Sequence, residues 1–245
     1  MRLKAYAAQT HQGPYLQVNE DGYDFDFDNQ LYMIFDGLGG SGIGDTCVDR
    51  LKQDVKQFYT QLSDDPNATM PLYYNPRNTL EENSLINSLL NAHQKIYQSN
   101  SDKPINQRAA ASGIVATMSE SLLVLLGVGN CVAYHFRKGR LHKLIQEDTL
   151  QFLSKDQFEY KFRTIPFSAI GMYPDVNYQL KEVRVSDGDQ VILMTDGVYG
   201  YVSEEELAYT MTSAAPDLTH RLNTLLKLSN SRGNTDNQTV MILEF

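Results

Sequence analysis

Cysteine is scarce in this sequence, which has only Cys47 and Cys131 among its 245 residues. Their spacing matches no metal-binding motif, and both lie in apolar patterns that are typical of buried thiols. We therefore expect neither a disulfide framework nor a cysteine-based metal site.

Basic residues are too few to balance the acidic ones. The chain has 21 Lys and Arg residues against 30 Asp and Glu residues, which gives a formal net charge of -9. A surface of this sign repels the phosphates of nucleic acids and of anionic lipids. The composition therefore favours neither nucleic acid nor a membrane as a partner.

Long apolar runs, repeats and linkers are also missing. The longest apolar run, residues 121–128, is too short to cross a bilayer, and no signal-type segment follows Met1. A length of 245 residues suits one domain with a substantial core. We expect a single domain over residues 1–245, in a soluble, cytoplasmic and monomeric protein.

The most informative stretch is residues 31–42, where five apolar residues lead to Asp36 and then to a glycine cluster. This pattern places Asp36 at the end of a buried strand. A carboxylate there would protonate unless a cation or hydrogen-bond donors hold its charge. Gly37 has no side chain, so its carbonyl is accessible to the same cation. Mg²⁺ and Mn²⁺ prefer such oxygen ligands.

Two other interpretations of this stretch stay open. Gly37, Gly39 and Gly42 match the dinucleotide-binding pattern G-x-G-x-x-G, and Asp54 lies at a plausible distance for a ribose contact. Against it, Asp36 would face a pyrophosphate, and no second strand-helix-strand unit follows. The other alternative is a glycine-rich turn that carries a solvated aspartate.

The remaining periodicity predicts helices and strands in alternating groups. Residues 11–28 are loop-like, although the alternation over 23–28 would place acids on one solvated face of a short ribbon. His93 is expected on a helix face in a structural role, and Ser203 with Glu206 forms a capping box. The expected helices are 43–62, 80–98, one after Ser203, 218–228 and a short one within 148–163; the expected strands are 3–10, 109–118, 121–127, 132–137, 140–145, 178–185, 190–195 and 238–245.

Further carboxylates lie at the ends of apolar strands. Asp196 follows one strand, Asp236 precedes the last, and Glu20 with Asp21 precedes the strand that ends at Asp36. If the sheets bring these ends together, the charges could be tolerated only around cations. Two metal ions could then share a carboxylate and activate a bridging water for attack on a phosphoryl group. The spacing alone also allows acids that merely cap turns.

The order of short motifs resembles the metal-dependent protein phosphatases of the PPM type, the type 2C serine/threonine phosphatases. The resemblance runs through nearly the whole chain. Its motifs are Asn19-Glu20-Asp21, Phe35-Asp-Gly-Leu-Gly-Gly40, the weaker Ala111-Ser-Gly113, Gly127-Val-Gly-Asn-Cys-Val-Ala-Tyr134, Ala169-Ile-Gly171, Leu193-Met-Thr-Asp-Gly197 and Asp236-Asn237-Gln-Thr-Val240.

The resemblance implies an α+β fold, a four-layer α-β-β-α sandwich with two facing, mainly antiparallel sheets and a metal site in a cleft at one end. It implies two Mn²⁺ or Mg²⁺ ions. Asp36 would bridge them and the Gly37 carbonyl would bind the second. Asp196 and Asp236 would complete the shell of the first. Asp21 and Glu20 would hold water in the shell of the second. A metal-bridged hydroxide would attack phosphorus without a phosphoenzyme intermediate.

The chain departs from the family pattern at three positions. No arginine stands between Arg2 and Asn19 to bind the substrate phosphate, so phosphate binding would be weaker. Asn130 stands where the family commonly has an aspartate that helps to bind a third ion, so we expect two ions. Leu38 replaces a histidine that some members use as an acid, and bacterial-type members often have an apolar residue there.

Two functions from different classes are consistent with these residues. The first is a metal-dependent phosphatase that hydrolyses phosphoserine and phosphothreonine in proteins, with substrates from a Ser/Thr kinase pathway. The second is a catalytically weak relative that serves as a binding or regulatory module. The retained Asp36, Asp196 and Asp236 favour the first, and the missing arginine and Asn130 favour the second.

Overall fold

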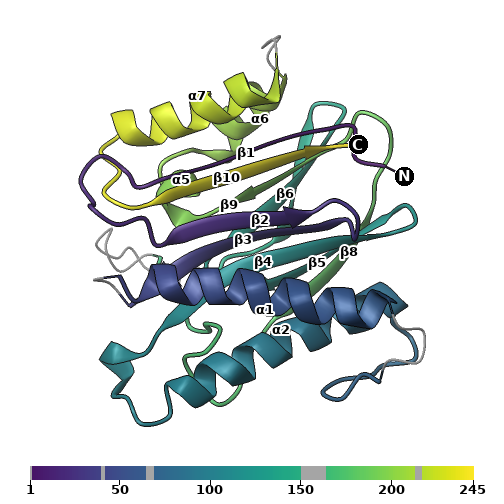
Figure 1. The fold of residues 1–245 in the computed structure, drawn as a ribbon. Helices are drawn as coiled ribbons and strands as arrows, with labels where there is room; N and C mark the ends of the chain where they lie inside the picture. Colours follow the sequence, from purple (N-terminus) through teal and green to yellow (C-terminus); the bar gives the residue numbers. More distant parts are fainter. Residues whose placement is uncertain (1, 40–41, 65–68, 150–163, 213–216) are drawn as a thin grey trace.

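The fold is an α+β sandwich of four layers (Figure 1). A computed structural model describes residues 2–39, 42–64, 69–149, 164–212 and 217–245. Two sheets face each other in the middle; α6 and α7 lie outside one sheet, and α1 and α2 lie outside the other. The resemblance predicted this fold class, and the structure confirms it.

The elements of the described residues follow one another along the chain. They are β1 (Ala5–His11), β2 (Asp21–Asp26), β3 (Leu31–Leu38), α1 (Gly44–Asp64), α2 (Leu80–Ser99), a 3-10 turn (Ile105–Gln107), β4 (Ala110–Ser119), β5 (Leu122–Val128), β6 (Val132–Arg137), β7 (Arg140–Ile145), β8 (Gln179–Arg184), β9 (Gln190–Met194), α5 (Asp196–Tyr199), α6 (Glu204–Thr212), α7 (Leu218–Ser231) and β10 (Gln238–Glu244).

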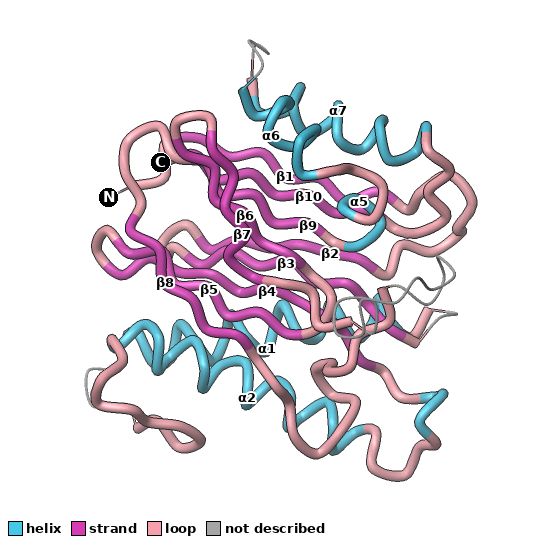
Figure 2. The backbone as a smooth tube through the Cα atoms, turned by 180° about the vertical axis from the view of Figure 1, so that it is seen from behind, coloured by secondary structure: helices cyan, strands magenta, loops and turns pink. Residues whose placement is uncertain are grey.

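Both sheets have five strands in the described residues, and every pairing between these strands is antiparallel. One sheet has the order β1-β10-β9-β6-β7 and the other β2-β3-β4-β5-β8. Figure 2 shows from behind that strands of the two sheets end close together on one side of the sandwich, next to α5. Segments far apart in the sequence meet at that end.

The apolar run before Asp36 is continuous because β3 is buried on both faces. Tyr32 and Ile34 face the core between the two sheets, whereas Met33 and Phe35 face α1 and α2. Successive side chains of a strand point to opposite faces, so a strand between two apolar layers needs apolar residues at every position. Asp36 lies where this doubly buried strand reaches the end of the sheet.

The helices follow the predicted periodicity. In α1, Cys47, Leu51 and Val55 recur on the face that packs against the second sheet. The predicted capping box is present, because the Ser203 hydroxyl accepts from the Glu206 amide and the Glu206 carboxylate accepts from the Ser203 amide. Cys47 and Cys131 are buried free thiols, as expected. None of the helices in the described ranges is both long and apolar enough to cross a lipid bilayer.

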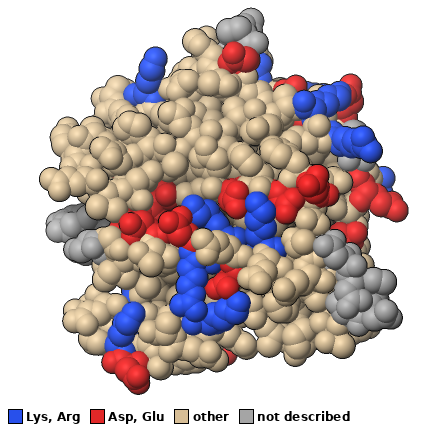
Figure 3. All heavy atoms as spheres, in the orientation of Figure 1, with Lys and Arg blue, Asp and Glu red and all other residues tan. Residues whose placement is uncertain are grey.

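Two local predictions were wrong. Residues 11–28 do not form one loop, because Asp21–Asp26 is strand β2, which pairs with β3. Its acids are also not simply solvated, because Lys56 of α1 approaches Asp24, with 3.5 Å between Nζ and Oδ2. Figure 3 shows acidic and basic side chains intermixed across this face.

The four-residue helix α5 was not predicted, since one turn is too short for a periodic pattern. The helix predicted within 148–163 falls almost entirely outside the described residues.

Candidate metal centre

Asp36 lies in the centre of the candidate site. It is opposite Asp21 in the β2–β3 pairing and opposite Ser112 in the β3–β4 pairing. Its side chain is buried, with 8% of the residue exposed. The register alone therefore places two carboxylates next to each other at the end of one hairpin.

Gly37 allows the backbone to pass very close to neighbouring segments. Its amide donates to the Glu20 carbonyl, with 3.1 Å between nitrogen and oxygen. A Cβ atom at this position would lie 2.5 Å from the same carbonyl and 2.8 Å from the Gly44 carbonyl oxygen. Any side chain would therefore push the hairpin end away from the loop before α1.

Asp196 comes from the other sheet. It begins α5 directly after β9 and Thr195. The Asn130 amide donates to Asp196 Oδ2 over 3.1 Å and to the Thr164 carbonyl over 2.9 Å. The Thr195 hydroxyl donates to Asp21 Oδ2 over 2.8 Å, which connects the two sheets. Neutral donors thus hold both carboxylates in position.

Asp236 is positioned by a compact turn before β10. The Asn237 amide donates to Asp236 Oδ1 over 2.8 Å. The Asn237 side chain accepts from the Glu20 amide and donates to the Gln12 and Val18 carbonyls. Asn237 therefore ties the Asp236 turn to the segment before β2. Sequence reasoning placed it in a motif but did not recognise this role, because its partners lie more than 200 positions away along the chain.

Three of the predicted carboxylates share one cavity. Asp36, Asp196 and Asp236 line it together with Gly37 and Asn130, and its volume is about 380 Å³. Asp21 is not among the lining residues, being buried against Thr195. Glu20 accepts from the Gly42 amide over 3.0 Å and so holds the glycine turn.

The site carries unbalanced negative charge. Burial, and then repulsion from Asp196, raises the pKa of Asp36 well above its usual value. Burial likewise raises the pKa of Asp21 to about 8, of Asp196 to about 7, and of Asp236 above its usual value. Across the described residues, no Lys, Arg or His lies within ion-pair distance of these four carboxylates. Without a cation, the cluster therefore holds protons near neutral pH.

The residues present fit a hard divalent cation in their chemistry. All the donors are oxygens, and the Asn130 Oδ1 atom is buried in the cavity wall without a hydrogen-bond partner. In the conformations of the described residues, no three His, Cys, Asp or Glu side chains surround one point closely enough to hold an ion. Asp36 and Asp196 instead lie close enough to repel each other, which raises the pKa of Asp36.

Two alternatives from the sequence can now be judged. The dinucleotide pattern needs a parallel strand-helix-strand unit, but β3 pairs antiparallel with both neighbours. His93 is structural: its Nδ1 accepts from the Gly171 amide over 3.0 Å, and its Nε2 lies 3.3 Å from the Pro174 carbonyl oxygen.

The fold has many close structural relatives. PppA, a key regulatory component of T6SS in Pseudomonas aeruginosa, superposes with a TM-score of 0.80 at 20% identity, covering 99% of this chain and 98% of that one. The PPM Ser-Thr phosphatase MsPP from Mycobacterium smegmatis gives 0.79 at 18% identity, with both chains covered at 100%. The catalytic domain of the phosphatase PstP, in complex with two manganese ions, gives 0.77 at 20% identity, covering 98% and 97%.

This chain has the fold of the PPM phosphatases. The similarity extends over its whole length, so no part of the sandwich lacks a counterpart. No protein-family model matches the sequence, and no curated protein sequence matches it. At identities near 20% the shared feature is the fold, and activity must be argued from the site itself.

Proposed function

We propose that this protein is a metal-dependent phosphatase that hydrolyses phosphoserine and phosphothreonine in proteins. One observation carries the proposal: Asp36, Asp196 and Asp236 line a single cavity, Asp36 and Asp196 are buried, and none of the described Lys, Arg or His side chains pairs with any of the three. Buried carboxylates in this state are stable only when protonated or when they bind cations. The same fold in PstP was crystallised with two manganese ions.

The proposed ligands are oxygen atoms of this chain. Asp36 would bridge two Mn²⁺ or Mg²⁺ ions, with the Gly37 carbonyl on the second and Asp196 and Asp236 on the first. Asp21 and Glu20 would act through water. The bound ions would lower the pKa of a shared water and neutralise charge on the phosphoryl oxygens.

Hydrogen bonds with neutral groups prepare these ligands. Asn130 fixes the orientation of Asp196, and Thr195 fixes that of Asp21. Glu20 accepts from the Gly42 amide, which fixes the Glu20 carboxylate next to the start of α1. Each contact reduces the freedom that the carboxylates would lose on binding an ion, and a shift of the described side chains would then bring them around it.

The rim of the cavity supports a peptide substrate. Ile165 and Tyr173 line the cavity and are 52% and 43% exposed, and nearby Phe167 is 50% exposed. Exposed apolar side chains beside an acidic cavity favour contacts with the residues that flank a phosphorylated side chain. None of the described residues that line the cavity is Lys or Arg, so phosphate binding would depend on the ions.

A catalytically weak binding module is the second candidate. The amide at Asn130 favours it, as does the lack of an arginine among the described residues that line the cavity. Under either function, we propose one domain over residues 1–245 with phosphorylated proteins as partners. The full-length superposition on MsPP supports the single domain.

Turnover with and without metal separates the two candidates. We would assay p-nitrophenyl phosphate and a phosphothreonine peptide with Mn²⁺, Mg²⁺ or chelator, and measure metal binding by calorimetry on the same samples. A phosphatase shows Mn²⁺- or Mg²⁺-dependent turnover that Asp36→Asn and Asp196→Asn abolish. Metal binding without turnover on either substrate would overturn the proposal in favour of the binding module.

A further inference from the structure

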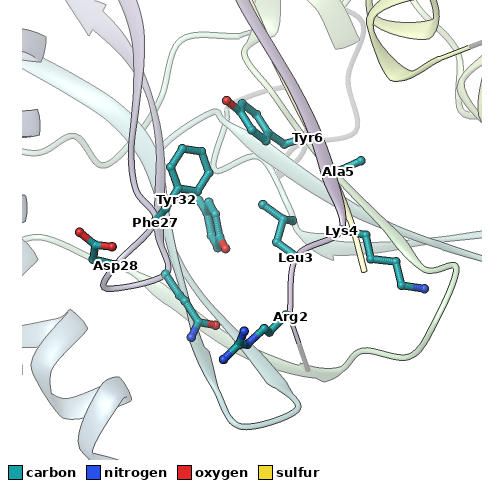
Figure 4. Close-up of a pocket in the computed structure, with 9 residues that line it drawn as sticks. Arg2, Leu3, Lys4, Ala5, Tyr6, Phe27, Asp28 and Tyr32 are labelled. Carbon is teal, nitrogen blue, oxygen red and sulfur yellow. The ribbon is translucent and has the colours of Figure 1, made fainter.

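A second cavity lies at the other end of the β2–β3 hairpin. Its volume is about 540 Å³, and residues from β1, the segment before it, the hairpin turn and β3 line it (Figure 4). Tyr32 lies four positions before Asp36 on β3, a distance of about 13 Å along an extended strand. This cavity is therefore separate from the carboxylate site.

Aromatic side chains form one wall of the cavity. The rings of Tyr6 and Phe27 are 5.0 Å apart between centroids, and Phe27 stacks on Phe25 at 5.2 Å. Tyr6 and Phe27 are 46% and 49% exposed, and Leu3 points toward them in Figure 4. These contacts hold a half-exposed apolar surface in place between the edge strands of the two sheets.

One polar group, the Tyr32 hydroxyl, reaches the cavity from a buried ring. Tyr32 is 1% exposed and lines the cavity, and its ring belongs to the core between the sheets. Its hydroxyl makes no hydrogen bond with any described residue. The hydroxyl of a largely buried tyrosine normally has a hydrogen-bond partner, which a molecule in the cavity can supply. Figure 4 shows this hydroxyl directed to the side of the cavity where the Arg2 guanidinium lies.

Arg2 provides the positive charge at this side. Across the described residues, no carboxylate pairs with it. Lys4, the other basic residue of the lining, pairs with Asp187 and points away from the cavity. The Asp28 carboxylate also points away from the cavity. The charge that faces the Tyr32 hydroxyl is therefore positive.

We propose that this cavity binds a small aromatic carboxylate. Its ring packs against Leu3 and Phe27, and its carboxylate accepts hydrogen bonds from the Tyr32 hydroxyl and the Arg2 guanidinium. The volume lies within the usual range of small-molecule pockets, roughly 300 to 1,000 Å³. Two convergent donors, one of them charged, select an anion over a neutral ligand of the same shape.

Calorimetric titration with 2-naphthoate tests the proposal, with 2-naphthamide as the uncharged probe of the same shape. We expect saturable binding at one site per chain, and at least tenfold weaker binding of the amide. Arg2→Gln should weaken naphthoate binding about tenfold, because it removes a charge-assisted hydrogen bond. Tyr32→Phe should weaken it about fivefold, the effect of one neutral hydrogen bond. Lys4→Gln is the matched control and should change the Kd less than about twofold.

Thermal unfolding shows that the variants are folded. Tyr32→Phe should unfold at the same temperature as the wild type or higher, since the hydroxyl has no protein partner to lose. The proposal is overturned if naphthoate shows no saturable binding, if the amide binds as tightly, or if Arg2→Gln leaves the Kd unchanged. A Lys4→Gln variant that loses as much affinity as Arg2→Gln would also overturn it, because the attraction would then be general.

Discussion

Two regions of this protein bury aspartates and treat their charge in opposite ways. Asp189, in the turn before β9, is 2% exposed, and Asp36 is 8% exposed. Burial raises the pKa of Asp189, but hydrogen bonds from Arg137 and Ser186, together with the nearby His135, outweigh burial, so its pKa lies below the usual value. Burial and neighbouring carboxylates raise the pKa of Asp36, and no basic group among the described residues opposes them.

The difference shows that burial alone does not decide the state of a carboxylate. Arg137 Nε donates to Asp189 over 2.7 Å and the Ser186 amide donates over the same distance, so the chain itself supplies the compensation. At the cavity, the described residues supply hydroxyl and amide donors to the carboxylates and no basic ones. Asp189 therefore stabilises the fold, whereas the cavity carboxylates remain available to an external cation.

The largest expected effect comes from removing the central cavity carboxylate. Asp36→Asn should lower Mn²⁺-dependent turnover roughly 10³-fold or more, because a shared ligand is lost. In metal-free buffer the same variant should be at least as stable as the wild type, since it removes an uncompensated carboxylate. Turnover and urea unfolding measure the two effects.

Asp24→Asn, on the same hairpin but away from the cavity, is the control and should keep full turnover. An Asp36→Asn variant that retains more than a tenth of wild-type turnover would contradict the proposed role.

Asp189→Asn should lower the stability of the fold and leave metal-dependent turnover unchanged, the opposite of what we expect for Asp36→Asn. We expect a loss of about 2 kcal/mol in the free energy of unfolding, because Arg137 and His135 lose their shared partner. This value is below that of a fully buried pair, since the Arg137 side chain is 38% exposed. Metal-dependent turnover should not change.

Asp187→Asn, two residues away and 79% exposed, is the matched control and should stay within about 0.5 kcal/mol of the wild type. Equal losses in the free energy of unfolding of both variants would mean that the buried Arg137–Asp189 pair stabilises the fold no more than an exposed pair does.

The two regions should also differ in their pH dependence without metal. The pKa of Asp21 is raised from 3.8 to about 8. Its contribution to stability is therefore fully present below the unfolded value and is lost as the pH rises toward about 8. Asp189 has a lowered pKa, so its contribution is present above the unfolded value and is lost as the pH falls.

Urea unfolding at pH 2.5, 4, 6 and 8 in metal-free buffer checks these signs. Relative to the wild type, Asp21→Asn should become more stable as the pH rises from 4 to 8, and Asp189→Asn should become less stable as the pH rises from 2.5 to 4. If the free energy of unfolding of both variants changed with pH in the same direction relative to the wild type, the two regions would not differ in their pH dependence.

The smallest expected effect concerns Asn130. Asn130→Asp adds a fourth carboxylate to the cavity wall and removes the donor to Asp196. We expect the variant to lose about 1 to 2 kcal/mol of stability without metal and to bind Mn²⁺ more tightly. Metal-free unfolding and calorimetry measure these changes; unchanged values in both would show that Asn130 does not tune the charge of the site.

Sequence patterns found the elements whose signal is local. The apolar run of β3 and the helical spacing of α1 predicted both elements within about two residues. Strand β2 was missed as a regular element because its acids oppose strand formation in isolation, and its pairing with β3 decides the outcome. The candidate acids were also found from the sequence, since each follows or precedes an apolar strand. Their roles as metal ligands stay predictions.

The chain order of hydrophobic and polar residues by itself determined the doubly buried strands, the amphipathic helices and the positions where carboxylates end a strand. Only the tertiary structure decided that Asp36, Asp196 and Asp236 line one cavity, that Asn130 and Asn237 hold them, and that Asp189 has Arg137 beside it. The reason is that electrostatic energy depends on distances between residues far apart in the chain, and no local pattern encodes those distances.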